Sequence, residues 1–173
     1  MAHAPGEAEI GDDRAPHAPA DQEARQGLQD GLAADALQQA VAAYRSEFRP
    51  SAQLDQPYVI AGVNVIAADT KSAAEEQLLA AKRGRAISLF GRGRSLTDQE
   101  ADQILASPAG RHVEQMVTYS AVGTPAEVNA YIEAFAAHAS ADELMVAHQS
   151  PTTEDRLRSV ELLADAVQPA AAT

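Results

Sequence analysis

The sequence has 173 residues, and 25 acidic against 13 basic side chains give it a formal net charge of −12. This charge excludes a general nucleic-acid-binding protein, because a phosphate backbone would be repelled at long range. Cysteine is absent, which excludes disulfides, thiolate metal sites and cysteine nucleophiles. We find neither an apolar run long enough to span a membrane nor a secretion leader, so we expect a soluble, cytoplasmic protein.

Alanine dominates the apolar composition, with 39 residues of this type. We therefore expect a thin core built largely from alanine-lined helix faces. Residues 1–22 combine prolines with alanine and acids, and we expect them, like residues 169–173, to form a disordered tail. Residues 23–168 make up the folded part. Its first element is an amphipathic helix over residues 28–48, which ends because a proline follows Arg49.

Two apolar segments indicate strands. Residues 57–68 form a nearly continuous β-branched run, which is typical of a strand buried on both faces of a parallel sheet. Residues 141–147 indicate a second, shorter strand. One face of the first strand contains Gly62 and Asn64, and Asn64 needs either an internal hydrogen bond, which we favour, or a ligand. The other face is uniformly apolar and suited to packing on helices: Val59, Ala61, Val63, Val65 and Ala67.

Capping motifs predict the helices, and the helix that Ser72 opens is expected to end near Lys82. The order of strands and helices predicts an α/β fold whose parallel strands are joined by helical crossovers. The predicted helix starts are Ser72/Glu75, Thr97/Glu100, a stretch from about Arg111, Thr124-Pro125-Ala126-Glu127, and Ser150-Pro151. Side chains expected to pack on helical faces include Met116, Tyr119, Tyr131, Leu157, Val160, Leu163 and Val167.

A cationic segment stands out in this acidic chain, and no acidic residue interrupts it between Glu76 and Asp98. Such clustering suggests a phosphate-binding loop around Gly91-Arg92-Gly93-Arg94, although the P-loop motif is absent. The alternative, which we favour, is a solvated loop whose cations pair with acids elsewhere. The candidate anion-binding residues are Arg83, Arg85, Arg92 and Arg94, preceded by Lys82.

Polar residues follow both predicted strands, where ligands gather in α/β folds. Asp69-Thr70 follows the first strand, and His148-Gln149-Ser150 follows the second. Thr70 and Ser150 also fit helix N-caps, which explains them without a ligand. A Ser150–His148–Asp165 triad is rejected because there is no nucleophile elbow, and the histidine spacing makes a metal site improbable.

Four segments resemble the luciferase-like (LLM class) flavin-dependent oxidoreductases and monooxygenases, specifically their carboxyl-terminal part. The resemblance covers roughly residues 36 to 168. The segments, in chain order, are Tyr44-Arg45-Ser46-Glu47-Phe48-Arg49-Pro50-Ser51, Gly62-Val63-Asn64-Val65-Ile66-Ala67-Ala68-Asp69-Thr70, Tyr119-Ser120-Ala121-Val122-Gly123-Thr124-Pro125-Ala126-Glu127-Val128 and Ala141-Asp142-Glu143-Leu144-Met145-Val146.

The resemblance implies a partial (β/α)8 TIM barrel, about its last two βα units, with extra helices. The two strands would match barrel strands seven and eight, with the first six missing, so no catalytic residue can be carried over. Reduced FMN, or alternatively the deazaflavin F420, would react with oxygen or pass a hydride beside a small-molecule substrate. Residues placed near the barrel mouth, as candidate cofactor-binding groups, are Asn64, Asp69, Thr70, His148, Gln149 and Ser150.

A sheet of two strands leaves both edges open, so we expect the isolated chain to be marginally stable or self-associating, with weak flavin binding. The alternative to an enzyme is a non-catalytic α/β interaction module, or one part of a split barrel. The expected partners are therefore a homo-oligomer or a complementing chain, in addition to flavin and substrate once the barrel is complete. Neither nucleic acid nor a membrane is an expected partner.

Overall fold

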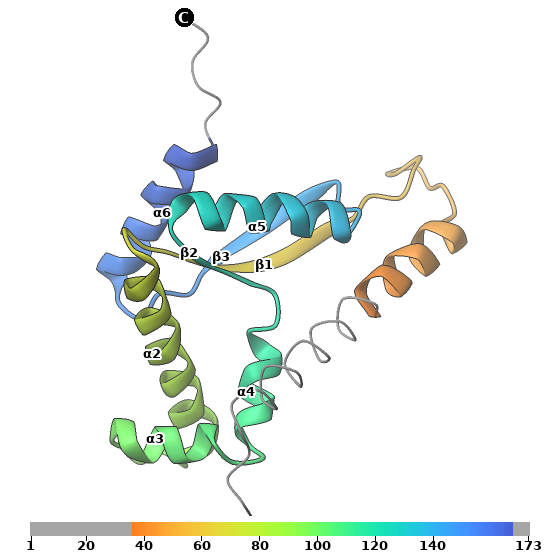
Figure 1. The fold of residues 1–173 in the computed structure, drawn as a ribbon. Helices are drawn as coiled ribbons and strands as arrows, with labels where there is room; N and C mark the ends of the chain where they lie inside the picture. The colour runs from red at the N-terminus through yellow and green to blue at the C-terminus, as the bar shows by residue number, and fades with distance from the viewer. Residues whose placement is uncertain (1–35, 168–173) are drawn as a thin grey trace, which may run out of the picture.

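The computed structural model describes residues 36–167, which form a three-stranded parallel sheet covered mainly by helices on one face (Figure 1). The predictions for the two tails and for residues 28–35 lie outside the described residues. A helix over residues 36–47 comes first. The other elements are β1 (Ile60–Ala67), α2 (Lys71–Phe90), α3 (Asp98–Leu105), α4 (Gly110–Met116), β2 (Ser120–Gly123), α5 (Pro125–His138), β3 (Glu143–His148) and α6 (Thr153–Val167).

The sheet has the order β2-β1-β3, and both pairings are parallel. The two predicted strands, β1 and β3, are direct neighbours from Ile60↔Glu143 to Val65↔His148. Sequence analysis missed β2, which pairs with the second half of β1. Because β2 has only four residues, it is too short to show a periodic pattern. Strands of a (β/α)8 barrel pair in chain order, whereas here the first strand in the chain is central.

One face of the sheet carries the main core. Val65, Ala67 and Ala121 pack with Val128 of α5 and with Leu162 and Leu163 of α6. Towards the other end of the strands, Ala61 and Val63 pack with Phe135 and Ala139. The alternating apolar face predicted for β1 is thus the face that α5 and α6 cover, and small alanine side chains let these helices approach closely.

Among the described residues, the second face is covered only near the carboxyl ends of the strands. There Ile66 and Ala68 pack against Ala74 of α2, together with Val122. Towards the amino ends, Ile60 is 52% exposed and Met145 is 65% exposed. We call this uncovered part the open face; it consists of Ile60, Gly62, Met145 and Ala147, together with the exposed Glu143 in register with Ile60. In Figure 1, α5 runs along one side of the sheet, while α2, α3 and α4 extend away on the other.

Two helix predictions need correction. Thr70, not Ser72, caps α2, because its Oγ1 accepts from the Ala73 backbone N–H at 3.2 Å. The helix then continues through Gly84 to Phe90, so Arg83 and Arg85 lie on a helix and not in a loop. One residue without a side chain does not stop a helix that packing supports.

The last helix also differs from its prediction. Thr152, not Ser150, caps it: Thr152 Oγ1 accepts from the Asp155 backbone N–H at 3.0 Å. Leu157, Val160 and Val167 of α6 are exposed, because the helix turns a different stripe to the sheet. That buried stripe is Ser159, Leu162 and Leu163. Likewise Tyr119 lies before β2, not on a helix, with its ring centroid 5.2 Å from that of Phe135.

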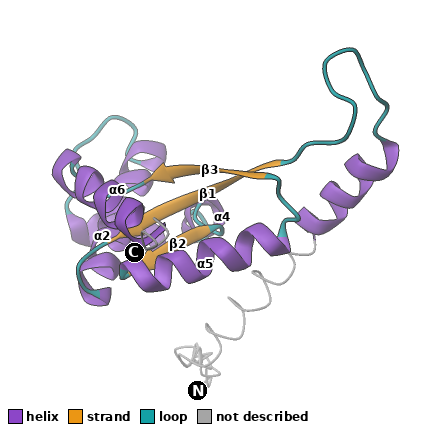
Figure 2. Cartoon of the chain, turned by 90° about the horizontal axis from the view of Figure 1, so that it is seen from above, coloured by secondary structure: helices purple, strands orange, loops and turns teal. Residues whose placement is uncertain are grey.

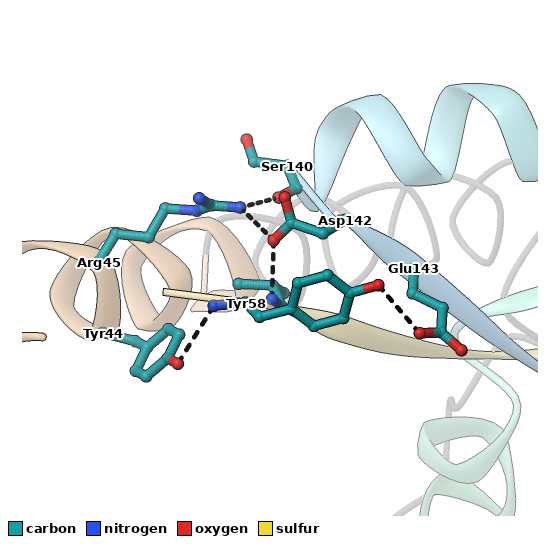
Figure 3. A network of polar contacts seen from close by, with 7 residues as sticks. Tyr44, Arg45, Tyr58, Ser140, Asp142 and Glu143 are labelled. Atoms are coloured by element: carbon teal, nitrogen blue, oxygen red, sulfur yellow. Dashed lines mark hydrogen bonds and ion pairs between the residues drawn. The ribbon is translucent and has the colours of Figure 1, made fainter. Parts of the chain in front are cut away.

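Polar contacts anchor the helix over residues 36–47 to the amino end of the sheet (Figure 3). Arg45 donates to the Ser140 carbonyl at 2.7 Å and to Asp142 Oδ2 at 2.9 Å. Asp142 Oδ2 also accepts from the Val59 backbone N–H at 2.8 Å. Figure 2 shows this helix beyond the end of the sheet, joined to it by a loop. Arg45 belongs to the first of the four segments that resemble the family. Through Arg45, this segment holds the start of β1 beside the start of β3.

Candidate functional site

The carboxyl ends of β1 and β3 lie side by side, because the strands are parallel neighbours. This brings Asp69 and Thr70 to the same edge of the sheet as His148, Gln149 and Ser150. The two groups do not form one cluster, however. Asp69 and His148 contact neighbouring residues of α6, whereas Thr70 and Gln149 contact α2.

Asp69 and Thr70 are both engaged in structural contacts. Asp69 accepts from Arg158 of α6 at 2.6 Å, and this hydrogen bond lowers the pKa of the Asp69 carboxyl. Thr70 caps α2. The capping explanation given for Thr70 is thus confirmed, and Asp69 ties the loop after β1 to α6.

His148 lies on the helix-covered face, in register with Val65. Its Nδ1 is 2.7 Å from Ser159 Oγ, and that hydroxyl also accepts from the Ala67 backbone N–H at 2.9 Å. Ser159 is fully buried. One hydroxyl therefore joins the last residues of both strands, and burial lowers the pKa of His148.

Gln149 extends from the other face and meets a residue of the predicted cationic segment. Its backbone N–H continues the ladder to the Val65 carbonyl at 2.9 Å. Its side-chain Oε1 accepts from Arg85 of α2 at 2.7 Å. The next residue, Ser150, is 3% exposed, and its Oγ has no hydrogen-bond partner among the described residues.

Asn64 makes the internal bonds that we favoured. Its Nδ2 donates to the Met116 carbonyl at 3.3 Å and to Ser120 Oγ at 3.4 Å. These contacts fasten β1 to β2 and to the end of α4. Asn64 thus lies beside the open face with its amide nitrogen already paired.

The four candidate anion-binding arginines do not converge. Arg83 forms a bidentate pair with Asp102 at 2.6 and 2.7 Å and a further contact with Asp98 at 2.9 Å. This guanidinium lowers the pKa of the Asp102 carboxyl. Arg92 and Arg94 are exposed in the loop after α2. Arg85 alone reaches the strand ends.

Sequence reasoning missed Arg158 and Ser159, which fasten both strand ends to α6. A signal for Ser159 exists: it precedes Leu162 and Leu163 by three and four residues, so it shares their buried stripe. Within the described residues, no group of three potential ligands could hold a metal ion. No helix in the same part of the chain is long and apolar enough to cross a membrane.

The arrangement combines a flat surface with hydrogen-bond donors. Gly62 leaves the middle of the open face without a side chain, and a Cβ added there would meet nothing within 4 Å. Donors from Arg85 and Ser150 lie at the carboxyl end of the same sheet.

No protein-family model matches the chain. Over 138 residues, 78% of this chain, it is 35% identical to the luciferase-like monooxygenase of Escherichia coli (strain K12). Over 125 residues, 70% of this chain, it is 37% identical to the uncharacterized protein YvbT of Bacillus subtilis (strain 168). The chain spans 41% and 37% of these relatives' lengths. The crystal structure of apo-MsnO8 matches 78% of this chain and 42% of its own, with 26% identity and a TM-score of 0.60.

Proposed function

We propose, from the kinship of this chain with luciferase-like monooxygenases over 138 residues, that it forms one wall of a flavin-dependent oxidoreductase. The wall would be the last two βα units of a (β/α)8 barrel, with β1 and β3 as its seventh and eighth strands. The chain spans about two fifths of the curated relatives that it matches, so the remaining strands are expected from polypeptide outside the matched region.

The open face carries this proposal. A surface that exposes Ile60 and Met145 is costly in water, since contiguous apolar surface favours a partner. The interior wall of a barrel has this composition, because side chains from the other strands cover it. The opposite face of the same sheet is closed by α5 and α6, as the outer face of a barrel would be.

Flavin fits this wall by shape and by polarity. Bound reduced flavin would supply the electrons that reach oxygen or a substrate. The residues of this chain would form one side of the flavin site. Gly62 and Met145 would support the ring with a flat apolar surface, and Gln149 and Ser150 would provide polar groups at the mouth of the barrel. FMN is the expected form, and the deazaflavin F420 is the alternative.

An FMN titration followed by flavin fluorescence tests the proposal. We expect weak but saturable quenching, with a dissociation constant above about 10 μM, because one wall makes only part of the contacts. Replacing Gly62 with leucine would place a bulky side chain on the open face and abolish the quenching. Leucine in place of exposed Gly84 on α2, where an added Cβ also meets nothing within 4 Å, is the control. If high micromolar protein leaves FMN fluorescence unchanged, this chain does not hold the cofactor alone.

The alternative is an α/β interaction module, and the outer edges of the sheet favour it. Neither the outer edge of β2 nor that of β3 pairs with another strand among the described residues. Such edges add strands readily. Copurification of a second polypeptide in fixed stoichiometry, without flavin binding, would favour this function over the enzyme.

A further inference from the structure

We propose that Arg85, Gln149 and Ser150 form a subsite for an oxyanion, the phosphate or carboxylate group of the ligand. This inference rests on the proposed function, since it names the chemical group that the same strand ends receive. It joins two features that the sequence places 64 residues apart, the cationic segment and the polar residues after β3.

Arg85 is unusual among the arginines of its segment. Arg83 is neutralised by Asp98 and Asp102. The recorded partner of Arg85 is instead the neutral amide of Gln149, and no carboxylate in the described part of the chain lies within ion-pair distance of it. A half-buried guanidinium without a counterion, in a chain of net charge −12, is available to an external anion.

Ser150 provides the second, independent observation. The residue is 3% exposed, and its buried Oγ has no hydrogen-bond partner among the described residues. It is also free of the capping role, because Thr152 performs it for α6. A buried hydroxyl without a hydrogen bond is destabilising, and an oxygen atom of a bound ligand would supply the missing partner.

The donors match an oxyanion chemically. The Arg85 guanidinium and the Ser150 hydroxyl can both donate, and Gln149 keeps its amide N–H groups because its oxygen already accepts from Arg85. Charged donors of this kind bind phosphate or carboxylate oxygens more strongly than neutral ones do.

Inorganic phosphate is the first probe, with the unfolding temperature of the whole chain and ³¹P line broadening as readouts. At about ten times the dissociation constant we expect the unfolding temperature to rise by about 3 °C. Arg85→Gln should remove both effects. Arg94→Gln makes the same charge change at an exposed position of the following loop and should keep them. If Arg85→Gln does not fold, Arg85→Lys replaces it and should weaken phosphate binding about tenfold.

Ser150→Ala separates ligand binding from a structural role. Without phosphate, this variant should unfold at the same or a higher temperature, because an unpaired buried hydroxyl is lost. Its affinity for phosphate should nevertheless fall about tenfold. Lower stability together with unchanged phosphate affinity would overturn the inference, and so would equal behaviour of Arg85→Gln and Arg94→Gln.

FMN, riboflavin and succinate distinguish the sources of the anion. Tighter binding of FMN than of riboflavin, lost in Arg85→Gln, assigns the subsite to the cofactor phosphate. If succinate binding depends on Arg85 while FMN and riboflavin bind with equal affinity, the subsite is assigned to a substrate carboxylate. Phosphate binding without any flavin binding would leave the subsite standing and remove the flavin-binding role proposed for this chain. Flavin binding that is the same in Arg85→Gln as in the wild-type chain, together with no effect of phosphate on the wild-type chain, would reject the subsite and leave the flavin-binding proposal standing.

Discussion

Single side chains join the elements of this fold, and Ser159 is the clearest case. Its fully buried hydroxyl contacts the Ala67 backbone N–H and His148 Nδ1, so one atom links β1, β3 and α6. Arg158, the preceding residue, pairs with Asp69 just after β1. These contacts hold the ends of the two strands where the proposed ligand groups lie.

Stability should depend on pH through His148. Burial lowers the pKa of His148 in the folded chain, whereas in the unfolded chain it binds a proton at its ordinary pKa of about 6.5. The unfolded state therefore binds more protons as the pH falls below about 6.5, and the free energy of unfolding should decrease from there. Urea unfolding at pH values between 7.5 and 5.5 measures this.

His148→Gln should lower stability at pH 7.5 yet flatten its dependence on pH. His112→Gln, at an exposed position of α4, is the matched control and should keep the slope of the wild-type chain. A His148→Gln variant with the full wild-type slope would show that another group is responsible.

At the scale of elements, identical capping boxes have different consequences. Thr124 with Glu127 caps α5, and Thr97 with Glu100 caps α3 in the same way. Helix α5 buries Val128 and Phe135 against the sheet, whereas α3 buries only Ala101. The local sequence motif is the same, so packing decides how much of the molecule depends on each cap.

Thr124→Ala should lower the global free energy of unfolding by about 1 kcal/mol, because an N-cap hydrogen bond is lost from a helix of the main core. Thr97→Ala removes the same bond but should mainly increase amide hydrogen exchange within α3. Equal loss of global stability in the two variants would contradict the view that α3 is peripheral.

At the scale of the whole molecule, the described residues leave apolar surface and strand edges uncovered. The open face, the outer strand edges of the described sheet and the exposed stripe of α6 have no covering element in this part of the chain. Under the proposed function, the rest of the barrel would cover the first two. The order β2-β1-β3 adds a constraint, because β2 pairs with the edge of β1 that a sixth barrel strand would use. In a complete barrel, β2 would therefore either separate from that edge of β1 or remain in the sheet as an additional strand.

The purified chain should self-associate, with an average mass from light scattering that rises with concentration, because association covers the open face. Met145→Glu places a charge on that face and should shift the chain towards monomer. The same change at exposed Ala134 on α5 should have no such effect. A wild-type chain that remains monomeric at 100 μM, with a sharp cooperative melt, would contradict the prediction.

The sequence by itself determined what depends on neighbouring residues: the caps at Thr97 and Thr124, the apolar face of β1, and the two strands whose apolar runs are long enough to recognise. Four resembling segments also predicted the relationship to luciferase-like monooxygenases. Only the tertiary structure decided the pairing of β2, the stripe that α6 buries, and the meeting of Arg85 with Gln149. These features join residues far apart in the chain, and their energies depend on which surfaces face one another, which no local pattern records.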